Sequence, residues 1–383
     1  MSYFKRKNSF TSFPVDVLRP THFLKYKLLC IELKVPYFNF KVGDNPDVLE
    51  IFSKDEIEKL KTDPYTFFVF DYTNEGEGID CYFNFYNAIT QSALKHNIPC
   101  NKMFFISSNL LEEETYKQWQ QQNQCDEINV LSFNRWSYKF EEVQNITIEH
   151  TLSNIKEKTN FLSLNRVIRY FRTLTILKLV NSNLKNHIRI SYDKFNMPYL
   201  EEIAALHYSR TGKQIPTREL LDLITSSPCI LDRSDFQINW VSSMPSDLFE
   251  STLVSLVNET LFDGSSIFYS EKTFKPMIYN HPLLIFGQPN INRSLEKIGF
   301  KTYDKYFDLS FDNIVNYSDR LDKQISYLEL LNEQLVSMST SQKVDWYMQG
   351  VDILLYNKNA LKDNFFNIKQ SNKFLSLLKD NSL

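Results

Sequence analysis

Residues 161–172 read Phe-Leu-Ser-Leu-Asn-Arg-Val-Ile-Arg-Tyr-Phe-Arg, and they indicate most directly how this chain folds. The run 161–164 is apolar and has the length of a buried strand. Asn165 is a residue type that caps helix N-termini, and the pattern after it predicts a helix over 166–180. A strand that leads straight into a helix is the repeating unit of a parallel α/β sheet, so we expect that fold class here.

The same alternation extends in both directions from this stretch. Strand-length apolar runs are expected at 28–33, 67–71, 103–107, 128–132, 251–257 and 282–286. Helical segments are expected at 54–60, 88–96, 112–121, 200–210 and 218–225, and three more near 319–338, 342–356 and 362–378. The polar segment 144–159 is expected to connect two domains. The sequence thus predicts an α/β protein of two Rossmann-like domains, residues 1–155 and residues 160–383, the second with a helical C-terminal tail.

Composition and charge exclude several classes of protein. The chain has 383 residues, and 43 Lys+Arg against 46 Asp+Glu give a net charge of −3. This length suits two domains better than one core. No run approaches the roughly 20 apolar residues of a membrane span. The N-terminus lacks an apolar signal segment, and the five Cys form no CxxC pair, so we expect a cytoplasmic protein with reduced thiols.

Missing motifs narrow the chemistry further. With eight Gly in the chain, neither the P-loop nor the GxGxxG dinucleotide motif occurs. The zinc motif HExxH, the hydrolase motif GxSxG and the Asp-x-Asp metal anchor of many sugar transferases are absent as well. We therefore expect no protein-bound metal and no tightly bound cofactor.

The three arginines of the opening stretch form the first candidate site. In the predicted helix, Arg166, Arg169 and Arg172 would lie at i, i+3 and i+6, within about a third of the circumference. A helix N-terminus adds a partial positive charge and free N–H groups, so this segment suits an anion, and phosphate best. The alternative is a solvated basic face opposite Val167 and Phe171.

A second candidate site combines two strand ends. Asn258 and Glu259 end one apolar run, and Glu271-Lys272 opens a helix that precedes the apolar run ending at Gly287. Open α/β sheets bind ligands at the carboxyl ends of their strands. A carboxylate there can hold ribose hydroxyls while a lysine neutralises a diphosphate. A capping glutamate with surface lysines is the alternative interpretation.

These residues carry a resemblance to a known family. The segment 271–287, EKTFKPMIYNHPLLIFG, resembles the donor site of GT-B glycosyltransferases of the fucosyltransferase type. Together with LNR at 164–166, VNET at 257–260 and GFKT at 299–302, it also resembles a group of phage and marine-bacterial proteins of glycosyltransferase type. That family has an aromatic residue three positions before its Glu-Lys pair. Phe268 stands there in this chain, and Tyr269 follows it.

The resemblance implies a metal-independent glycosyltransferase. It would move a sugar from a nucleoside-diphosphate-sugar, GDP- or UDP-linked, to the hydroxyl of a saccharide or similar acceptor. The acceptor would bind at the N-terminal domain and the donor at the C-terminal domain. The expected donor contacts are Arg166, Arg169, Arg172, Asn258, Glu259, Tyr269, Glu271, Lys272 and Lys275.

An inverting reaction of this type needs a carboxylate base in the N-terminal domain. Glu75 is our candidate, because it follows the strand 67–71 in a loop that holds Gly76 and Gly78. Asp71 and Glu77 compete for this role. A solvated acidic loop without a catalytic role is the alternative.

Two other functions remain open from the sequence. The acceptor could be phage DNA that carries a hydroxymethylated base, contacted through the basic segments 5–7 and 25–27. Alternatively, the chain could be a non-catalytic GT-B-like binding module. Failure to bind any sugar nucleotide would favour the binding module over an enzyme.

Overall fold

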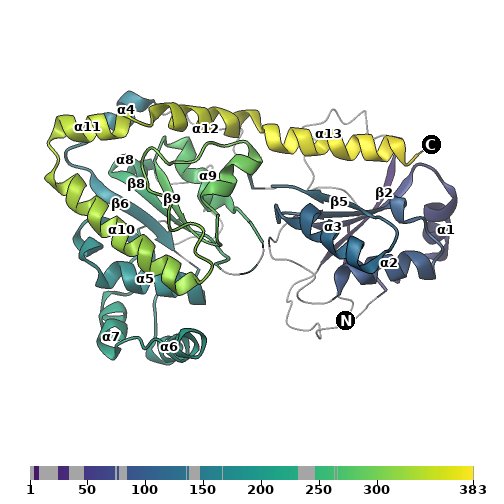
Figure 1. Ribbon diagram of the computed structural model, residues 1–383, viewed down its shortest axis with the longest axis horizontal. Helices are drawn as coiled ribbons and strands as arrows, with labels where there is room; N and C mark the ends of the chain where they lie inside the picture. Colours follow the sequence, from purple (N-terminus) through teal and green to yellow (C-terminus); the bar gives the residue numbers. More distant parts are fainter. Residues whose placement is uncertain are drawn as a thin grey trace. The chain divides into compact units, whose positions relative to one another are not determined.

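The computed structural model describes residues 4–7, 25–33, 47–73, 76, 84–134, 136–137, 147–165, 167–231, 246–262, 264 and 266–382. The chain forms two compact units, Met1–Tyr138 with Ser265–Tyr269 and Asn364–Leu383, and Lys139–Gly264 with Ser270–Asp363. Each unit contains one sheet of mainly parallel strands, and the chain ends in a series of helices (Figure 1). The predicted α/β class with two sheets and a helical tail is confirmed.

The sheet of the first unit has the strand order β1-β2-β3-β4-β5. Its strands are β1 (Phe4–Lys7), β2 (Lys27–Leu33), β3 (Thr66–Tyr72), β4 (Met103–Ser107) and β5 (Asn129–Ser132). Strands β2 to β5 are parallel, and β1 pairs antiparallel with β2 at the edge. Every residue of β3 is buried, as expected for a central parallel strand covered on both faces.

Side chains of β3 alternate between two hydrophobic cores, one on each face of the sheet, and helices cover both faces. Phe68 and Phe70 point into a core shared with α1 (Lys54–Thr62), α2 (Phe85–Lys95) and α3 (Glu112–Asn123). Phe67 and Val69 point into the opposite core, which includes Phe374 of α13 (Phe365–Asp380). In Figure 1, α13 is the yellow helix that ends the chain.

The compact units differ from the predicted domains, 1–155 and 160–383, in three places. Helix α4 (Ile148–Leu152) belongs to the second unit, and Ser265–Tyr269 and α13 belong to the first. The ring centroids of Phe104 and Phe374 lie 5.0 Å apart. The side chain of Asn367 accepts a hydrogen bond from Asn134 N at 3.1 Å and donates one to Asn134 O at 2.7 Å. These contacts attach the end of the tail to the first sheet.

The sheet of the second unit has the order β7-β6-β8-β9, and all of its strands are parallel. Its strands are β6 (Thr159–Asn165), β7 (Ile188–Tyr192), β8 (Thr252–Asn258) and β9 (Leu283–Phe286). The helices before the tail are α5 (Tyr170–Asn181), α6 (Met197–Thr211), α7 (Thr217–Ser226), α8 (Ser246–Glu250) and α9 (Glu271–Ile278). The sequence did not predict β1 or β7.

The tail contains more helices than predicted. It consists of α10 (Tyr317–Ser337), α11 (Thr340–Met348), α12 (Val351–Asp363) and α13. The expected helix 342–356 breaks at Gly350, where an added Cβ would lie 2.4 Å from Cε2 of Tyr306. The expected helix 362–378 breaks at Asn364, whose φ of 49° is left-handed. Asparagine adopts this conformation more readily than most residues.

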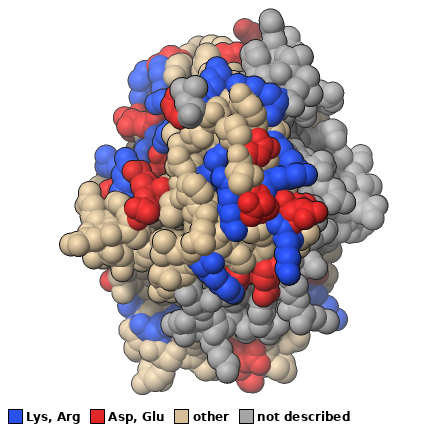
Figure 2. Space-filling view, turned by 90° about the vertical axis from the view of Figure 1, so that its right-hand side faces the viewer, with Lys and Arg blue, Asp and Glu red and all other residues tan. Residues whose placement is uncertain are grey.

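The face shown in Figure 2 agrees with the balanced composition. On the face in Figure 2, Lys and Arg side chains lie among Asp and Glu side chains. No helix in the described part of the chain has both the length and the apolarity to cross a membrane.

His281 is a buried titratable group that precedes β9. Its Nε2 donates to Phe249 O of α8 at 2.7 Å, and its Nδ1 lies 3.1 Å from Ser255 Oγ of β8. Burial, together with the charge of Lys158, lowers the pKa of His281 from 6.5 to about 3. This histidine therefore packs as a neutral core residue that ties α8 to β8.

We predict that His281 makes stability depend on pH below about 6.5. Because the folded pKa lies below the unfolded one, the unfolded chain takes up the proton first as the pH falls, and stability is lost. The linkage relation gives a loss of about 2 kcal/mol in unfolding free energy between pH 7.5 and pH 5. Denaturant titrations at both pH values would measure it. The His281→Gln variant is expected to lose this dependence; an unchanged dependence would contradict the prediction.

Candidate functional site

The strand order of the second sheet reverses between β6 and β8. The chain proceeds from β6 outward to β7 on one side, and from β8 outward to β9 on the other. Open α/β sheets bind ligands at the carboxyl ends of strands at such a reversal. Both strands end in asparagine, and Asn258 Nδ2 donates to Asn165 Oδ1 at 2.7 Å. Asn258 Oδ1 is buried and has no hydrogen-bond partner within the described residues.

Glu259 follows Asn258 and is fixed by two donors. Its Oε1 accepts from Ser270 N at 2.9 Å and from Thr273 Oγ1 at 2.6 Å. Its Oε2 lies 4.0 Å from Lys272 Nζ and accepts no hydrogen bond from the described part of the chain. The side chain is fully buried. Two hydrogen bonds to Oε1 thus hold the Glu259 carboxylate in position, and Oε2 is able to accept a further hydrogen bond.

The N-terminus of α9 supplies charge beside Glu259. Ser270 is its N-cap, and Lys272 Nζ donates to Ser270 Oγ at 3.1 Å. Burial lowers the pKa of Lys272, while the charge of Glu259 opposes this effect. Burial raises the pKa of Glu271, but Lys272 and Lys275 outweigh it, so the net pKa of Glu271 is lowered. Lys275 lies one turn further along α9 and is partly buried.

The arginine segment differs from its prediction. Asn165 is the last residue of β6 and caps no helix, because its side chain is bonded to Asn258 and, at 2.8 Å, to Ser163 Oγ. Helix α5 begins at Tyr170, and Arg169 is its N-cap, with extended φ and ψ of −146° and 155°. The predicted helical face of three arginines is therefore wrong.

Arg172 is the arginine that α5 directs inward. It is buried, its Nη1 donates to Val167 O at 2.6 Å, and its Nε has no hydrogen-bond partner among the described residues. Burial and the charge of Arg169 lower the pKa of Arg172 to about 10, while Glu259 and Glu271 oppose the shift. Arg172 is therefore a cation at neutral pH, within electrostatic reach of the Glu259 carboxylate.

Four predicted site residues remain. Arg169 is exposed, Tyr269 is fully buried, and Arg166 and Glu75 lie outside the described residues. Gly76, in the loop predicted to carry the base, packs closely on Phe268. A Cβ added to Gly76 would lie 2.0 Å from Cγ of Phe268, so only glycine fits there.

Sequence reasoning missed Arg320 of α10. This side chain is 1% exposed and donates from Nε and Nη2 to Gly287 O at 3.2 and 2.8 Å. Its Nη2 also donates to Phe262 O, and its Nη1 donates to Ile314 O and Val315 O. It thereby holds the chain after β8 and after β9. No spacing in the sequence relates Arg320 to Gly287, because the two are 33 residues apart.

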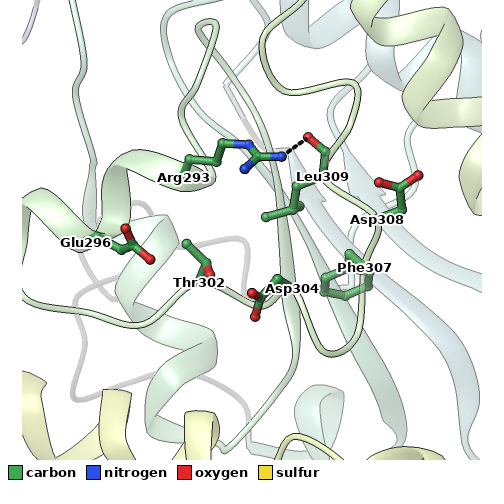
Figure 3. Close-up of a pocket in the computed structure, with 7 residues that line it drawn as sticks. All are labelled: Arg293, Glu296, Thr302, Asp304, Phe307, Asp308 and Leu309. Carbon is green, nitrogen blue, oxygen red and sulfur yellow. Dashed lines mark hydrogen bonds between the residues drawn. The ribbon is translucent and has the colours of Figure 1, made fainter.

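A separate pocket of about 430 Å³ lies beyond β9 (Figure 3). Its lining combines one arginine, three acidic residues, one threonine and two apolar residues: Arg293, Glu296, Thr302, Asp304, Phe307, Asp308 and Leu309. Arg293 Nη2 donates to Leu309 O at 3.3 Å. None of the predicted site residues lines it. In the described ranges, no three or more His, Cys, Asp or Glu side chains group so as to hold a metal ion.

Comparison with known proteins gives little further information. No protein-family model and no curated protein matches the chain. A structure described as trehalose-6-phosphate from E. coli bound with UDP-2-fluoro glucose covers 80% of this chain and 67% of its own, with 12% identity and a TM-score of 0.37. A trehalose-6-phosphate synthase, OtsA, covers 85% and 74%, with 12% identity and a TM-score of 0.40. Similarity at this level assigns neither fold nor activity.

We predict that Thr273→Val destabilises the site. The substitution keeps the shape of the side chain but removes the hydroxyl that donates to Glu259 Oε1. A hydrogen bond to a charged group contributes about 1.5–3 kcal/mol. Denaturant unfolding should show a loss of this size. Thr175→Val is the matched control, because its hydroxyl donates to a carbonyl of its own helix, Phe171 O, at 3.1 Å. Equal losses in the two variants would refute the special role of Thr273.

Proposed function

We propose that the chain is a GT-B glycosyltransferase that moves a sugar from a nucleoside-diphosphate-sugar to an acceptor hydroxyl. The observation that carries this proposal is the pair of buried acceptor oxygens, Asn258 Oδ1 and Glu259 Oε2, at the strand reversal. Buried polar atoms rarely stay unsatisfied unless a ligand or water completes them. The ligand that fits offers hydroxyl donors to these oxygens and negative charge to Arg172.

A ribose diphosphate meets both requirements. Ribose hydroxyls would donate to Glu259 Oε2, and the diphosphate would lie at the N-terminus of α5. A helix N-terminus binds phosphate through its free N–H groups and its partial positive charge. Arg166, Arg169 and Arg172 would add charge from the same segment, and Lys272 and Lys275 from α9. Asn258, Tyr269 and Glu271 complete the proposed donor contacts.

The chemical step would depend on charge at the leaving group. As the bond from the sugar to the β-phosphate breaks, negative charge develops on the nucleoside diphosphate. Positioned cations stabilise such developing charge most where water is excluded. Arg169, Arg172 and Lys272 are our candidates for this role, so no protein-bound metal is needed. In an inverting reaction, Glu75 would take the proton from the acceptor hydroxyl.

We favour a saccharide acceptor over modified DNA. A DNA acceptor calls for a continuous basic surface, because phosphate contacts dominate such binding. On the face in Figure 2, basic and acidic side chains are interspersed. Lys25 lies over the rings of Tyr26 and Tyr65, 4.8 and 5.3 Å from their centroids, and is thereby engaged within its own unit.

The first experiment is a thermal-shift screen with GDP, UDP, CDP, ADP and their common sugar conjugates, with and without Mg²⁺. A ligand at 100 times its dissociation constant stabilises the fold by about 2.7 kcal/mol, which is readily measured. Stabilisation by one nucleotide would support the transferase. No response at millimolar ligand would instead favour a non-catalytic binding module.

The variants Arg169→Ala and Lys272→Ala test the donor site. Each removes a charge-assisted contact to the diphosphate, so donor affinity is expected to fall by a factor of about 10 to 100. Calorimetry with the nucleotide found in the screen would measure it. Lys297→Ala removes an exposed lysine of the turn Arg293–Ile298 and serves as the control. Wild-type affinity in both site variants would refute this site.

Glu75→Gln tests the proposed base. The substitution keeps the size of the side chain but removes its ability to accept a proton. Donor binding is expected to stay at the wild-type level, while transfer to the acceptor falls at least a hundredfold, within the range typical of a general base. Turnover assays with the identified donor would measure both. Full turnover would exclude Glu75 from this role.

A further inference from the structure

Tyr170, Tyr317 and His207 form a hydrogen-bonded cluster, here called the phenol cluster, at the start of α5. The hydroxyls of Tyr170 and Tyr317 are hydrogen-bonded to each other. His207 Nδ1 lies 3.3 Å from the Tyr317 hydroxyl and 3.5 Å from that of Tyr170. The cluster joins three helices, because Tyr170 begins α5, His207 belongs to α6 and Tyr317 begins α10. It therefore fixes the first turn of α5 from the side of two other helices.

Aromatic packing strengthens this attachment. The ring of Phe171 stacks on Phe262, which follows β8, at 5.3 Å and 10°, and meets the Tyr317 ring edge-on at 4.9 Å. The guanidinium of Arg210 lies 5.1 Å from the centroid of the Tyr170 ring. A cation over an aromatic face is an attractive contact. Both aromatic residues of the first turn are thus held by partners from outside α5.

The first turn of α5 needs such anchors because of its own charges. Arg169 and Arg172 flank the two aromatic residues, so two guanidiniums lie at the positive end of the helix dipole. Burial and the charge of Arg169 lower the pKa of Arg172, and the nearby carboxylates of Glu259 and Glu271 oppose this shift only in part. The contacts of Tyr170 and Phe171 supply further stabilisation to the turn.

We propose that the phenol cluster is a positioning device that holds the first turn of α5 in the conformation that receives a diphosphate. Tyr170, Tyr317 and His207 act through the turn, and Arg169 and Arg172 make the contacts. This inference rests on the proposed function, since it concerns the same anion site. It adds His207 of α6 and Tyr317 of α10, which no sequence motif identified, to the residues that shape this site.

The cluster also predicts a dependence on pH. In its tautomer with the proton on Nε2, neutral His207 accepts a hydrogen bond at Nδ1, whereas the protonated ring accepts none. Burial lowers the pKa of His207 from 6.5, the charges of Lys178 and Lys213 lower it further, and Asp322 opposes them. The cluster therefore stays intact at neutral pH and loses its acceptor only in acid. The charges that act on His207 are those of Lys178 on α5, Asp322 on α10 and Lys213 just after α6. Arg210 of α6 lies over the Tyr170 ring, and Asp319 of α10 pairs with Lys213 at 2.9 Å.

The test uses Tyr317→Phe in the full-length chain with inorganic pyrophosphate as the probe. The substitution removes one hydroxyl and keeps the ring against Phe171. Pyrophosphate affinity is expected to fall about five- to tenfold, the loss typical of one hydrogen bond. Amide exchange of Thr173, whose N–H donates to Arg169 O at 2.8 Å, is expected to become faster, and the remainder of α5 to keep its protection. The local change in exchange is a readout that general destabilisation does not produce.

Two controls make the outcome decisive. Tyr327→Phe removes a hydroxyl on the same helix that bonds Asp308 N at 3.1 Å and Tyr306 O at 3.3 Å, and it should leave pyrophosphate affinity unchanged. The loss of pyrophosphate affinity from pH 7 to pH 5 should be smaller in His207→Gln than in wild type. Unchanged affinity and exchange in Tyr317→Phe would overturn the proposal. So would a wild type that binds nucleoside diphosphates but no pyrophosphate, and that result would leave the proposed function intact.

Discussion

A buried guanidinium fixes the carboxyl edge of the second sheet. Arg320 cannot be deprotonated at physiological pH, and a buried charge without hydrogen bonds costs several kcal/mol. Its donors therefore need acceptors, and they bond the backbone carbonyls of Phe262, Gly287, Ile314 and Val315. Three segments that are distant in the sequence are held around one side chain as a result.

The candidate site depends on this arrangement. Glu259 N donates to Phe286 O at 2.9 Å, and Gly287, the next residue, is the one whose carbonyl Arg320 holds. A Cβ added to Gly287 would lie 3.5 Å from Cβ of Glu259, so strand end and carboxylate fit closely. Arg320 also lies one turn after Tyr317 on α10. The helix that begins with Tyr317 of the phenol cluster thus also carries the arginine that holds Gly287.

This edge of the sheet holds buried polar atoms that lower stability unless a water or a ligand satisfies them. Glu259 Oε2, Asn258 Oδ1 and Arg172 Nε are buried polar atoms without hydrogen-bond partners in the described residues. A buried polar atom that neither water nor ligand reaches costs about 1–3 kcal/mol. The surrounding core offsets this cost, since the strands β8 and β9 are buried along their whole length. Unsatisfied polar atoms of this kind are typical of sites prepared for a ligand.

The sequence by itself determined the α/β class, most of the strands and the tail, because buried parallel strands appear as short apolar runs and helices as amphipathic ones. It also placed Glu259 at a strand end and Lys272 in the first turn of a helix. Only the tertiary structure decided where α5 begins, since the Asn165 side chain pairs with Asn258 rather than capping a helix. The strand reversal, the attachment of α13 to the first sheet and the contacts of Arg320 were likewise beyond the sequence. All of them join residues far apart in the chain, and local propensity and periodicity carry no information about such pairs.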